Sequence, residues 1–393
     1  YISMKTEIKL IRNTLIYTLL ILAMACKKDT KKNQRSEAVS EMEGEQVEST
    51  IELLVGTYSD EESKGIYKYN FNPATGTLSD KILLAEQTSP TFLCISKDRS
   101  TVYSVNRPDP ATTAIYKWNE DRTALNLQST HLVEGEGPCN VVLNEAENLL
   151  AVANYSSGNI AVYPLDSNGA ISGGTQTRQH SGTGPILPNQ ESPRAHCALF
   201  DASGRFLYIS DLGIDKVLQY PIDSEGNLQV PQVAFAADPG DGPRLLISHP
   251  NKNQVFMINE LSSSVVSARV DKETGTFTRI DKQSTLPPDF KDKNSCADIR
   301  LSNDGRFLYA SNRGHNSIAI FSVTEEGKLS LLRNEPVQGD WPRNFTLSPD
   351  GEFLLVANRK SNNIVVFKVD KKSGMLTYSE NQASISQPVC LVF

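Results

Sequence analysis

Apolar and polar residues alternate in short runs along most of the chain, and tight-turn sequences separate the runs. Alternation with a period of two is typical of β-strands, and an Asp-Gly pair between two such runs favours a hairpin. The clearest example of such a turn is 348–351 (SPDG). Around it the pattern predicts strands at 343–347, 353–357 and 364–369 and a further strand from Met375.

This unit of four runs occurs seven times along the chain. The copies begin at Pro90, Pro138, Pro193, Pro243, Ser295, Pro342 and Pro388. Consecutive starts are 48, 55, 50, 52, 47 and 46 residues apart. A period of about 50 residues built from four short strands is typical of β-propellers. The sequence therefore predicts an all-β fold, a seven-bladed β-propeller with four antiparallel strands per blade.

The seventh copy is divided between the two ends of the repeat region. Residues 51–57, 65–71 and those from Leu78 onward match the second, third and fourth strands of the unit, and no first strand precedes them. The missing strand is found at 388–393 (PVCLVF). We therefore expect one blade to be shared between the N- and C-termini, which closes the ring and leaves no open sheet edge.

The order of strands sorts the connections onto two faces of the ring. If the strands of a blade, named A to D, run alternately down and up, all A–B turns lie on one face. These are ordinary tight turns such as 201–204 (DASG) and 302–305 (SNDG). The B–C and D–A loops lie on the opposite face, which we call the mouth face. We expect the starts of A strands and the ends of B strands to surround this mouth.

Charged residues dominate the positions expected at the mouth. They are Arg194, His196, Arg244 and Arg343 at the starts of A strands, and Arg107, Asn154, Asp211, Glu260, Arg313 and Arg359 at the ends of B strands. Arginine is suited to bidentate recognition of carboxylate or phosphate, so six arginines together predict a site for a small anionic molecule. Alternatively, each arginine pairs with a neighbouring Asp or Glu and locks adjacent blades together.

Charge and motifs narrow the chemistry further. The 393-residue chain has a formal net charge of −7, which disfavours nucleic acid as a partner. It contains no phosphate-binding loop, dinucleotide fingerprint, HExxH, G-x-S-x-G or CxxC, so we expect no cofactor and no metal. Hydrolysis of an anionic ester or lactone remains, in which His196 or Glu260 activates water and arginines stabilise the oxyanion.

Residues 1–26 have the features of a secretory signal peptide. Three basic residues precede the apolar run 14–25, which is too short to span a bilayer. The run ends in Ala-Met-Ala followed by Cys26, similar to the lipobox of bacterial lipoproteins. We therefore predict lipidation of Cys26, with a plain cleaved signal as the alternative.

Residues 27–48 are polar and nearly free of large apolar side chains, which predicts a flexible tether before the propeller at 49–393. We expect an exported, membrane-anchored lipoprotein in the periplasm or at the cell surface. Its contact with the membrane would be through the lipid alone, and we expect a monomer.

Several motifs together resemble the seven-bladed propeller lactonases, whose namesake is the propeller-type 6-phosphogluconolactonase. They are GTYS (56–59), GPCNVVLN (137–144), VANYSSGNIAVY (152–163), SDLGIDKVLQY (210–220), GPR (242–244), NELSSSV (259–265), DGRFLYASNRGHNSIAIFSV (304–323) and WPRNF (341–345). The resemblance covers residues 51–393. It implies cofactor-independent hydrolysis of a sugar-derived lactone, with active-site residues at His196, Arg244, Glu260 and Arg313.

The chain departs from the family pattern at two positions of the expected site. Leu245 follows Gly-Pro-Arg where the family often has His, and Arg194 stands where the family often has the first residue of His-x-His. Two other functions therefore stay open beside hydrolysis of an anionic or sugar-derived lactone. One is a non-catalytic propeller that binds a sugar acid or a protein, and the other is a lyase similar to the fungal carboxy-muconate cyclases.

Overall fold

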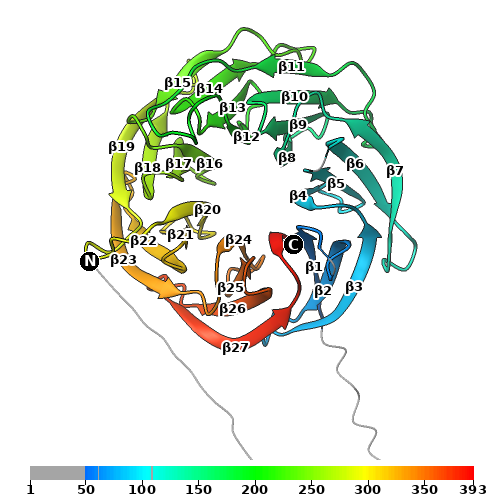
Figure 1. Ribbon diagram of the computed structural model, residues 1–393, viewed down its shortest axis with the longest axis vertical. Coiled ribbons are helices and arrows are strands. Elements are labelled where there is room, and N and C mark those ends of the chain that lie inside the picture. Colours follow the sequence, from blue (N-terminus) through cyan, green and yellow to red (C-terminus); the bar gives the residue numbers. More distant parts are fainter. Residues whose placement is uncertain (1–48, 61, 108) are drawn as a thin grey trace, which may run out of the picture. The chain divides into compact units, whose positions relative to one another are not determined.

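The structure is a computed structural model that describes residues 49–60, 62–107 and 109–393. In this part of the chain the regular elements are β-strands, which form seven four-stranded antiparallel sheets arranged as the blades of a ring (Figure 1). The predicted signal peptide, the lipidation site Cys26 and the tether lie outside the described residues. Among the described residues no helix is long and apolar enough to cross a membrane.

The strands of each blade follow one another from the centre of the ring outward (Figure 1). From the innermost strand, the blades are β28 (Pro388–Val392), β1 (Ile51–Thr57), β2 (Gly65–Phe71), β3 (Leu78–Glu86); β4 (Pro90–Ile95), β5 (Thr101–Asn106), β6 (Thr112–Trp118), β7 (Leu125–Leu132); β8 (Pro138–Leu143), β9 (Leu149–Asn154), β10 (Asn159–Pro164), β11 (Gln176–Gln179); β12 (Ala195–Phe200), β13 (Phe206–Asp211), β14 (Lys216–Pro221), β15 (Gln232–Ala236); β16 (Pro243–Ser248), β17 (Gln254–Asn259), β18 (Ser264–Val270), β19 (Phe277–Ser284); β20 (Ser295–Leu301), β21 (Phe307–Arg313), β22 (Ser317–Val323), β23 (Leu329–Pro336); and β24 (Pro342–Leu347), β25 (Phe353–Asn358), β26 (Asn363–Val369), β27 (Leu376–Ser384). We number these blades 1 to 7 in this order.

The predicted ring closure is confirmed. Strand β28 from the C-terminal end pairs antiparallel with β1, with Leu54 opposite Val392 and Val55 opposite Leu391. The backbone N–H of Tyr58 continues the joint by donating to the carbonyl of Gln387 (3.0 Å). The two ends of the repeat region thus complete blade 1.

The hydrophobic core lies between neighbouring blades. The second and third strands of a blade are buried on both faces, so β25 (FLLVAN) is fully buried instead of alternating. Its side chains pack against those of blade 6, including Tyr309 and Ile320. In the outermost strand β27 only Leu376 is buried, and the remaining positions are partly buried or exposed because one side of this strand faces solvent.

A β-bulge interrupts the innermost strand of every blade near the mouth face. In blade 4 the pairing passes from Ala195 directly to Cys197, so His196 is the extra residue. The corresponding register shifts make Arg244 the extra residue of blade 5 and Arg343 that of blade 7. In the other blades the shifts fall at Val389, Thr91, Cys139 and the pair Ala297 and Asp298. Bulges commonly re-aim side chains beside active sites, and here they do so for three charged or titratable residues.

Candidate active site

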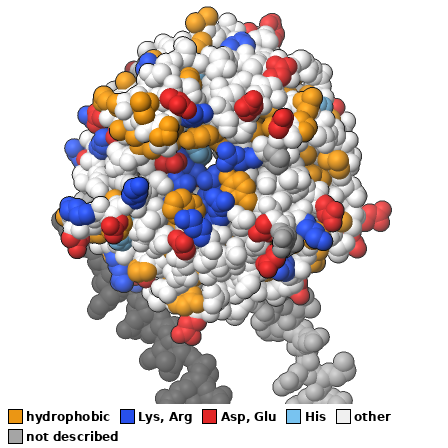
Figure 2. Space-filling model, viewed as in Figure 1, with side chains coloured by type: hydrophobic (Ala, Val, Ile, Leu, Met, Phe, Trp, Pro, Cys, Tyr) orange, Lys and Arg blue, Asp and Glu red, His pale blue; other side chains and the backbone are white. Residues whose placement is uncertain are grey.

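Two repeated positions supply the residues of the mouth. The first is the bulge of the innermost strand. The second directly follows a polar residue near the end of each second strand, which is Thr57, Asn106, Asn154, Asp211, Asn259, Asn312 or Asn358. The residues at this second position are Tyr58, Arg107, Tyr155, Leu212, Glu260, Arg313 and Arg359. Lys and Arg side chains gather around the hollow at the centre of this face (Figure 2). Most of their charged residues fall into two clusters on neighbouring arcs of the ring.

Arg244, Glu260 and Arg313 form what we call the paired cluster, in blades 5 and 6. The Glu260 carboxylate accepts from Arg244 Nε (2.8 Å) through Oε2 and lies 3.0 Å from Arg313 Nη2 through Oε1. The Arg244 and Arg313 side chains are only 4% and 5% exposed, and that of Glu260 is 15% exposed. Burial raises the pKa of Glu260, but the charges of Arg313, Arg244 and Arg343 outweigh it and lower the pKa. Glu260 is therefore ionised and held between two guanidinium groups.

Backbone carbonyls fix the two arginines of the paired cluster. Arg313 donates to the carbonyls of Ser295 (3.2 Å) and Cys296 (2.7 Å), and Arg244 Nη1 donates to the carbonyl of Ala297. All three carbonyls belong to β20, the innermost strand of blade 6. The cluster is rigid because each guanidinium is bound to both a carboxylate and the backbone.

His196 lies beside the paired cluster, in blade 4. It is buried, and the Tyr155 ring packs edge-on against it at 5.6 Å between centroids. Burial, together with the charges of Arg244, Arg343 and Arg313, holds the pKa of His196 well below its usual value. Its Nδ1 has no hydrogen-bond partner in any other described residue. This nitrogen is itself buried from solvent, and His196 is thus a neutral imidazole in a positive field.

Tyr58, Arg107, Arg343 and Arg359 form the open cluster, in blades 7, 1 and 2. The guanidinium carbons of Arg359, Arg343 and Arg107 lie 4.4, 5.5 and 6.0 Å from the centre of the Tyr58 ring. None of these arginines has a carboxylate within 4.0 Å among the described residues. Burial, with the charges of Arg343 and Arg107, lowers the pKa of Arg359, since like charges are crowded together. A cluster of unneutralised guanidinium groups favours an anionic ligand.

Arg194 belongs to neither cluster. Its guanidinium lies 5.5 Å above the Tyr155 ring and donates to the carbonyl of Ser156 (2.9 Å). It also lies 3.3 Å from the carboxylate of Glu191, a half-exposed contact at the rim. The structure therefore places Arg194 at the edge of the mouth.

Asn154 and Asp211 are not brought into the mouth. Both are fully buried at the ends of β9 and β13, and their side chains turn toward their own blades. Asn154 donates to Asn159 Oδ1 (3.0 Å). Asp211 accepts from the backbone N–H groups of Arg194 and Gly213 and lies 2.6 Å from His180 Nδ1. These contacts hold loops in place. Asn154 Oδ1 has no partner among the described residues, but it is buried, so neither side chain presents a polar atom to the mouth.

Sequence reasoning missed Tyr58, Tyr155 and Trp341. Tyr58 and Tyr155 occupy the same repeat position as Glu260, directly after the polar residue that ends the B-strand pairing, and this position was the available signal. Trp341 precedes the A strand of blade 7 in a left-handed conformation (φ 68°), and its ring lies 5.5 Å from the Arg313 guanidinium. Bulky residues with positive φ are uncommon outside special sites.

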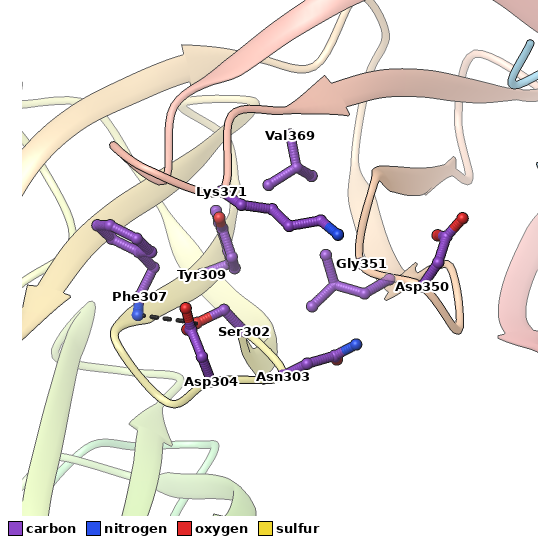
Figure 3. Close-up of a pocket in the computed structure, with 10 residues that line it drawn as sticks. Ser302, Asn303, Asp304, Phe307, Tyr309, Asp350, Gly351, Val369 and Lys371 are labelled. Atoms are coloured by element: carbon purple, nitrogen blue, oxygen red, sulfur yellow. Dashed lines mark hydrogen bonds between the residues drawn. The ribbon is translucent and has the colours of Figure 1, made fainter. Parts of the chain in front are cut away.

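The face opposite the mouth carries clefts at equivalent junctions between blades. One cleft of about 100 Å³ lies between blades 6 and 7 and is lined by A–B turn residues such as Asp304 and Asp350, with Tyr309 and Lys371 (Figure 3). Clefts lined by equivalent turns occur between blades 2 and 3 and between blades 4 and 5. A cavity that recurs at equivalent blade junctions reflects ring geometry, and its turns are closed by local bonds such as Phe307 N–H to Ser302 Oγ (3.0 Å).

No metal site is evident in the described ranges of the chain, where no group of three or more His, Cys, Asp or Glu is placed to hold an ion. The five cysteines of the propeller are free thiols, and the four that are fully buried have a raised pKa because burial disfavours the thiolate.

Comparison with known proteins gives a consistent picture. The profile of the family described as "Lactonase, 7-bladed beta-propeller" matches residues 52–393. The 6-phosphogluconolactonase of Bacillus subtilis is 33% identical over 341 residues, which are 86% of this chain and 97% of that protein. The structure of the Pseudomonas aeruginosa periplasmic gluconolactonase is 30% identical, with a TM-score of 0.83 over 88% of this chain and 99% of that one. A Lactobacillus plantarum protein structure is 33% identical, with a TM-score of 0.81 over 87% and 99% of the two chains.

Proposed function

The chain belongs to the lactonase family of seven-bladed β-propellers, and from that premise we propose that its mouth hydrolyses an anionic or sugar-derived lactone without a cofactor. The observation that carries this proposal is the neutral, buried His196 beside the paired cluster. A general base must be unprotonated, and burial and the neighbouring arginines keep His196 in that state.

His196, and not Glu260, is the base in this proposal. Glu260 has a lowered pKa, and its two carboxylate oxygens are each engaged by a guanidinium group. An acceptor held in this way is a poor base, because taking a proton would leave two buried positive charges without their partner. Glu260 instead holds Arg244 and Arg313 in position.

The reaction then follows from the geometry. His196 removes a proton from a water molecule while the water oxygen attacks the lactone carbonyl carbon. Negative charge develops on the carbonyl oxygen, and the guanidinium groups of Arg244 and Arg313 stabilise it, because their positions are fixed before the reaction begins. Cleavage of the bond between the carbonyl carbon and the ring oxygen opens the lactone to a hydroxy acid.

The open cluster binds the anionic part of the substrate. Arg107, Arg343 and Arg359 carry positive charge that no described carboxylate within 4.0 Å neutralises. Arg343 also lies close enough to lower the pKa of both His196 and Glu260. A substrate that spans the mouth would therefore place its anionic group near Arg343 and its carbonyl near His196.

The full-length protein tests this function directly. Initial rates of ring opening, measured by proton release, are compared with the spontaneous rates for δ-gluconolactone, 6-phosphogluconolactone and a muconate-derived lactone. We expect acceleration of at least one sugar-derived lactone, and a loss of about 10³-fold in kcat in the His196→Gln variant. If no lactone opens faster than its spontaneous rate while a sugar acid raises the Tm, the protein is a binding propeller.

We also propose that the protein is an exported lipoprotein, as expected from residues 1–26. Radiolabelled palmitate should be incorporated into the wild-type chain and not into a Cys26→Ala variant. Incorporation into both would contradict the lipidation of Cys26.

A further inference from the structure

Tyr58 is surrounded by positive charge from three blades. It directly follows β1 at the joint between the two chain ends, and its ring is the common contact of Arg107, Arg343 and Arg359. The nearest carboxylate along the described chain, that of Asp60, is engaged elsewhere by Ser386 Oγ (2.5 Å) and Gln387 Nε2 (3.0 Å). Within the described residues, the groups that face the phenol are therefore guanidinium groups.

The hydroxyl group of Tyr58 has an unused proton. Its oxygen accepts a hydrogen bond from Arg107 Nη1 (2.8 Å). No described residue accepts the hydroxyl hydrogen in return, although a phenol both donates and accepts. The arginines cannot accept it, because a guanidinium has no acceptor atom. The proton is therefore available to a ligand in the mouth.

Tyr155 occupies the equivalent position in blade 3 and shows the opposite tendency. Burial and the negative charge of Glu260 raise the pKa of Tyr155. Burial also acts to raise the pKa of Tyr58, but the charges of Arg343, Arg107 and Arg359 outweigh it and lower the pKa. Of two tyrosines at one repeat position, only Tyr58 has a lowered pKa, because Tyr155 has the carboxylate of Glu260 nearby as well as arginines.

Lactone hydrolysis needs a proton donor that the paired cluster does not contain. When the ring C–O bond breaks, the leaving oxygen is an alkoxide, which is a poor leaving group until it is protonated. Glu260 is ionised, arginine holds its proton too tightly to donate it, and His196 is engaged in taking the proton of the attacking water. We propose that Tyr58 is a catalytic general acid that protonates the leaving oxygen, opposite the base His196. This inference rests on the proposed function.

Every proton that moves in this reaction can be accounted for. His196 takes one proton from water as the C–O bond to the carbonyl carbon forms, and becomes imidazolium. The bond to the ring oxygen then breaks, and that oxygen takes the Tyr58 proton, which leaves a phenolate among three guanidinium groups. The imidazolium proton returns to the phenolate through solvent, and the product carboxylic acid releases its proton to the medium.

The Tyr58→Phe variant tests the assignment, because it keeps the ring that the three arginines contact and removes only the proton. With a lactone that the wild-type protein opens, we expect kcat to fall about 100-fold and KM to stay within about twofold. A wild-type activity that declines as pH rises toward 10 should lose that decline in the variant, since a general acid must be protonated. The matched control is Tyr67→Phe, which removes a hydroxyl group from the same blade away from the arginines and should keep wild-type kcat.

Unchanged kcat in Tyr58→Phe, or a raised KM with unchanged kcat, would overturn the proposal while leaving the lactonase function intact. Wild-type protein that opens no lactone would instead overturn the proposed function. Circular dichroism and the Tm establish that the variant is folded. If it is not, 3-fluorotyrosine at position 58, a more acidic phenol of nearly the same size, should move the basic decline of kcat to lower pH, and an unmoved decline would overturn the proposal.

Discussion

The paired and open clusters use the same residue type on neighbouring arcs of one mouth, and they differ in one carboxylate. In the paired cluster Glu260 binds both Arg244 and Arg313, whose side chains are almost fully buried. In the open cluster three arginines surround a phenol, and no described carboxylate lies within 4.0 Å of them. A buried guanidinium needs a counter-charge supplied by the protein. A partly exposed guanidinium is hydrated and can stay unpaired until an anionic ligand binds. The difference suggests that one cluster is built for positioning and the other for binding.

Removing the shared carboxylate should have the largest effect. In Glu260→Gln, Arg244 and Arg313 lose their common counter-charge, and we expect the free energy of unfolding to fall by about 3–5 kcal/mol. Urea denaturation at pH 7 measures this change. The control is Glu191→Gln, whose carboxylate pairs with Arg194 at the exposed rim and should change stability by less than about 1 kcal/mol.

The stability of Glu260→Gln should also differ from that of the wild type in its dependence on pH. Because the pKa of Glu260 is lowered by folding, its contribution is present above about pH 4.5 and is lost as pH falls through the lowered value. The stability of Glu260→Gln should therefore depend less on pH in the acid range than that of the wild type. Equal stability of the two proteins at pH 7 would mean that the paired cluster does not need its carboxylate.

Neutralising one arginine of the open cluster should leave the fold unchanged and weaken binding. In Arg359→Gln we expect a KM about tenfold higher for a phosphorylated lactone, since one charged contact contributes about 1.5 kcal/mol. Stability should stay within about 1 kcal/mol, because the variant disturbs the hydrogen bond from Arg359 Nε to Gln387 Oε1 (3.1 Å) but breaks no ion pair among the described residues. Lys360→Gln, which removes the adjacent cation outside the cluster, is the control and should keep the wild-type KM. If Arg359→Gln lost as much stability as Glu260→Gln, the two clusters would not differ in the way proposed here.

The smallest effect is expected in the acid range of the pH profile. A histidine with its usual pKa of about 6.5 would lose about tenfold of its unprotonated form between pH 7.5 and 5.5. The pKa of His196 is well below that value, because burial and the arginines disfavour the imidazolium. For a lactone without an ionisable group, kcat/KM should therefore change by less than about twofold across this range. A tenfold decline would show that the arginines do not keep His196 neutral.

The repeat allowed most of the fold to be predicted. The strands expected at 343–347, 353–357 and 364–369 agree within one residue with β24, β25 and β26, because apolar alternation and Asp-Gly turns are local signals. The shared blade was predictable because a missing first strand and an extra last one complement each other. The order of strands also placed Arg244, Glu260 and Arg313 on one face, where the structure brings them into contact.

The detailed geometry of the mouth was not predictable, because it depends on pairing between strands. A bulge changes the register by one residue without altering composition, so nothing in the sequence marks His196, Arg244 and Arg343 as the extra residues. Asn154 and Asp211 end their strands as expected, yet their side chains turn into the blades to satisfy loop groups. Tyr58 carries no charge of its own at neutral pH, and only the structure reveals the three arginines around it.

The most direct test of this account separates the two clusters in one measurement. Values of kcat and KM are determined for the same δ-lactone with and without a phosphoryl group, in the wild type, His196→Gln and Arg359→Gln. We predict that His196→Gln lowers kcat on both substrates with little change in KM, and that Arg359→Gln raises KM on the phosphorylated substrate alone. An Arg359→Gln variant that lowers kcat equally on both substrates, or a His196→Gln variant that keeps wild-type kcat, would contradict the account.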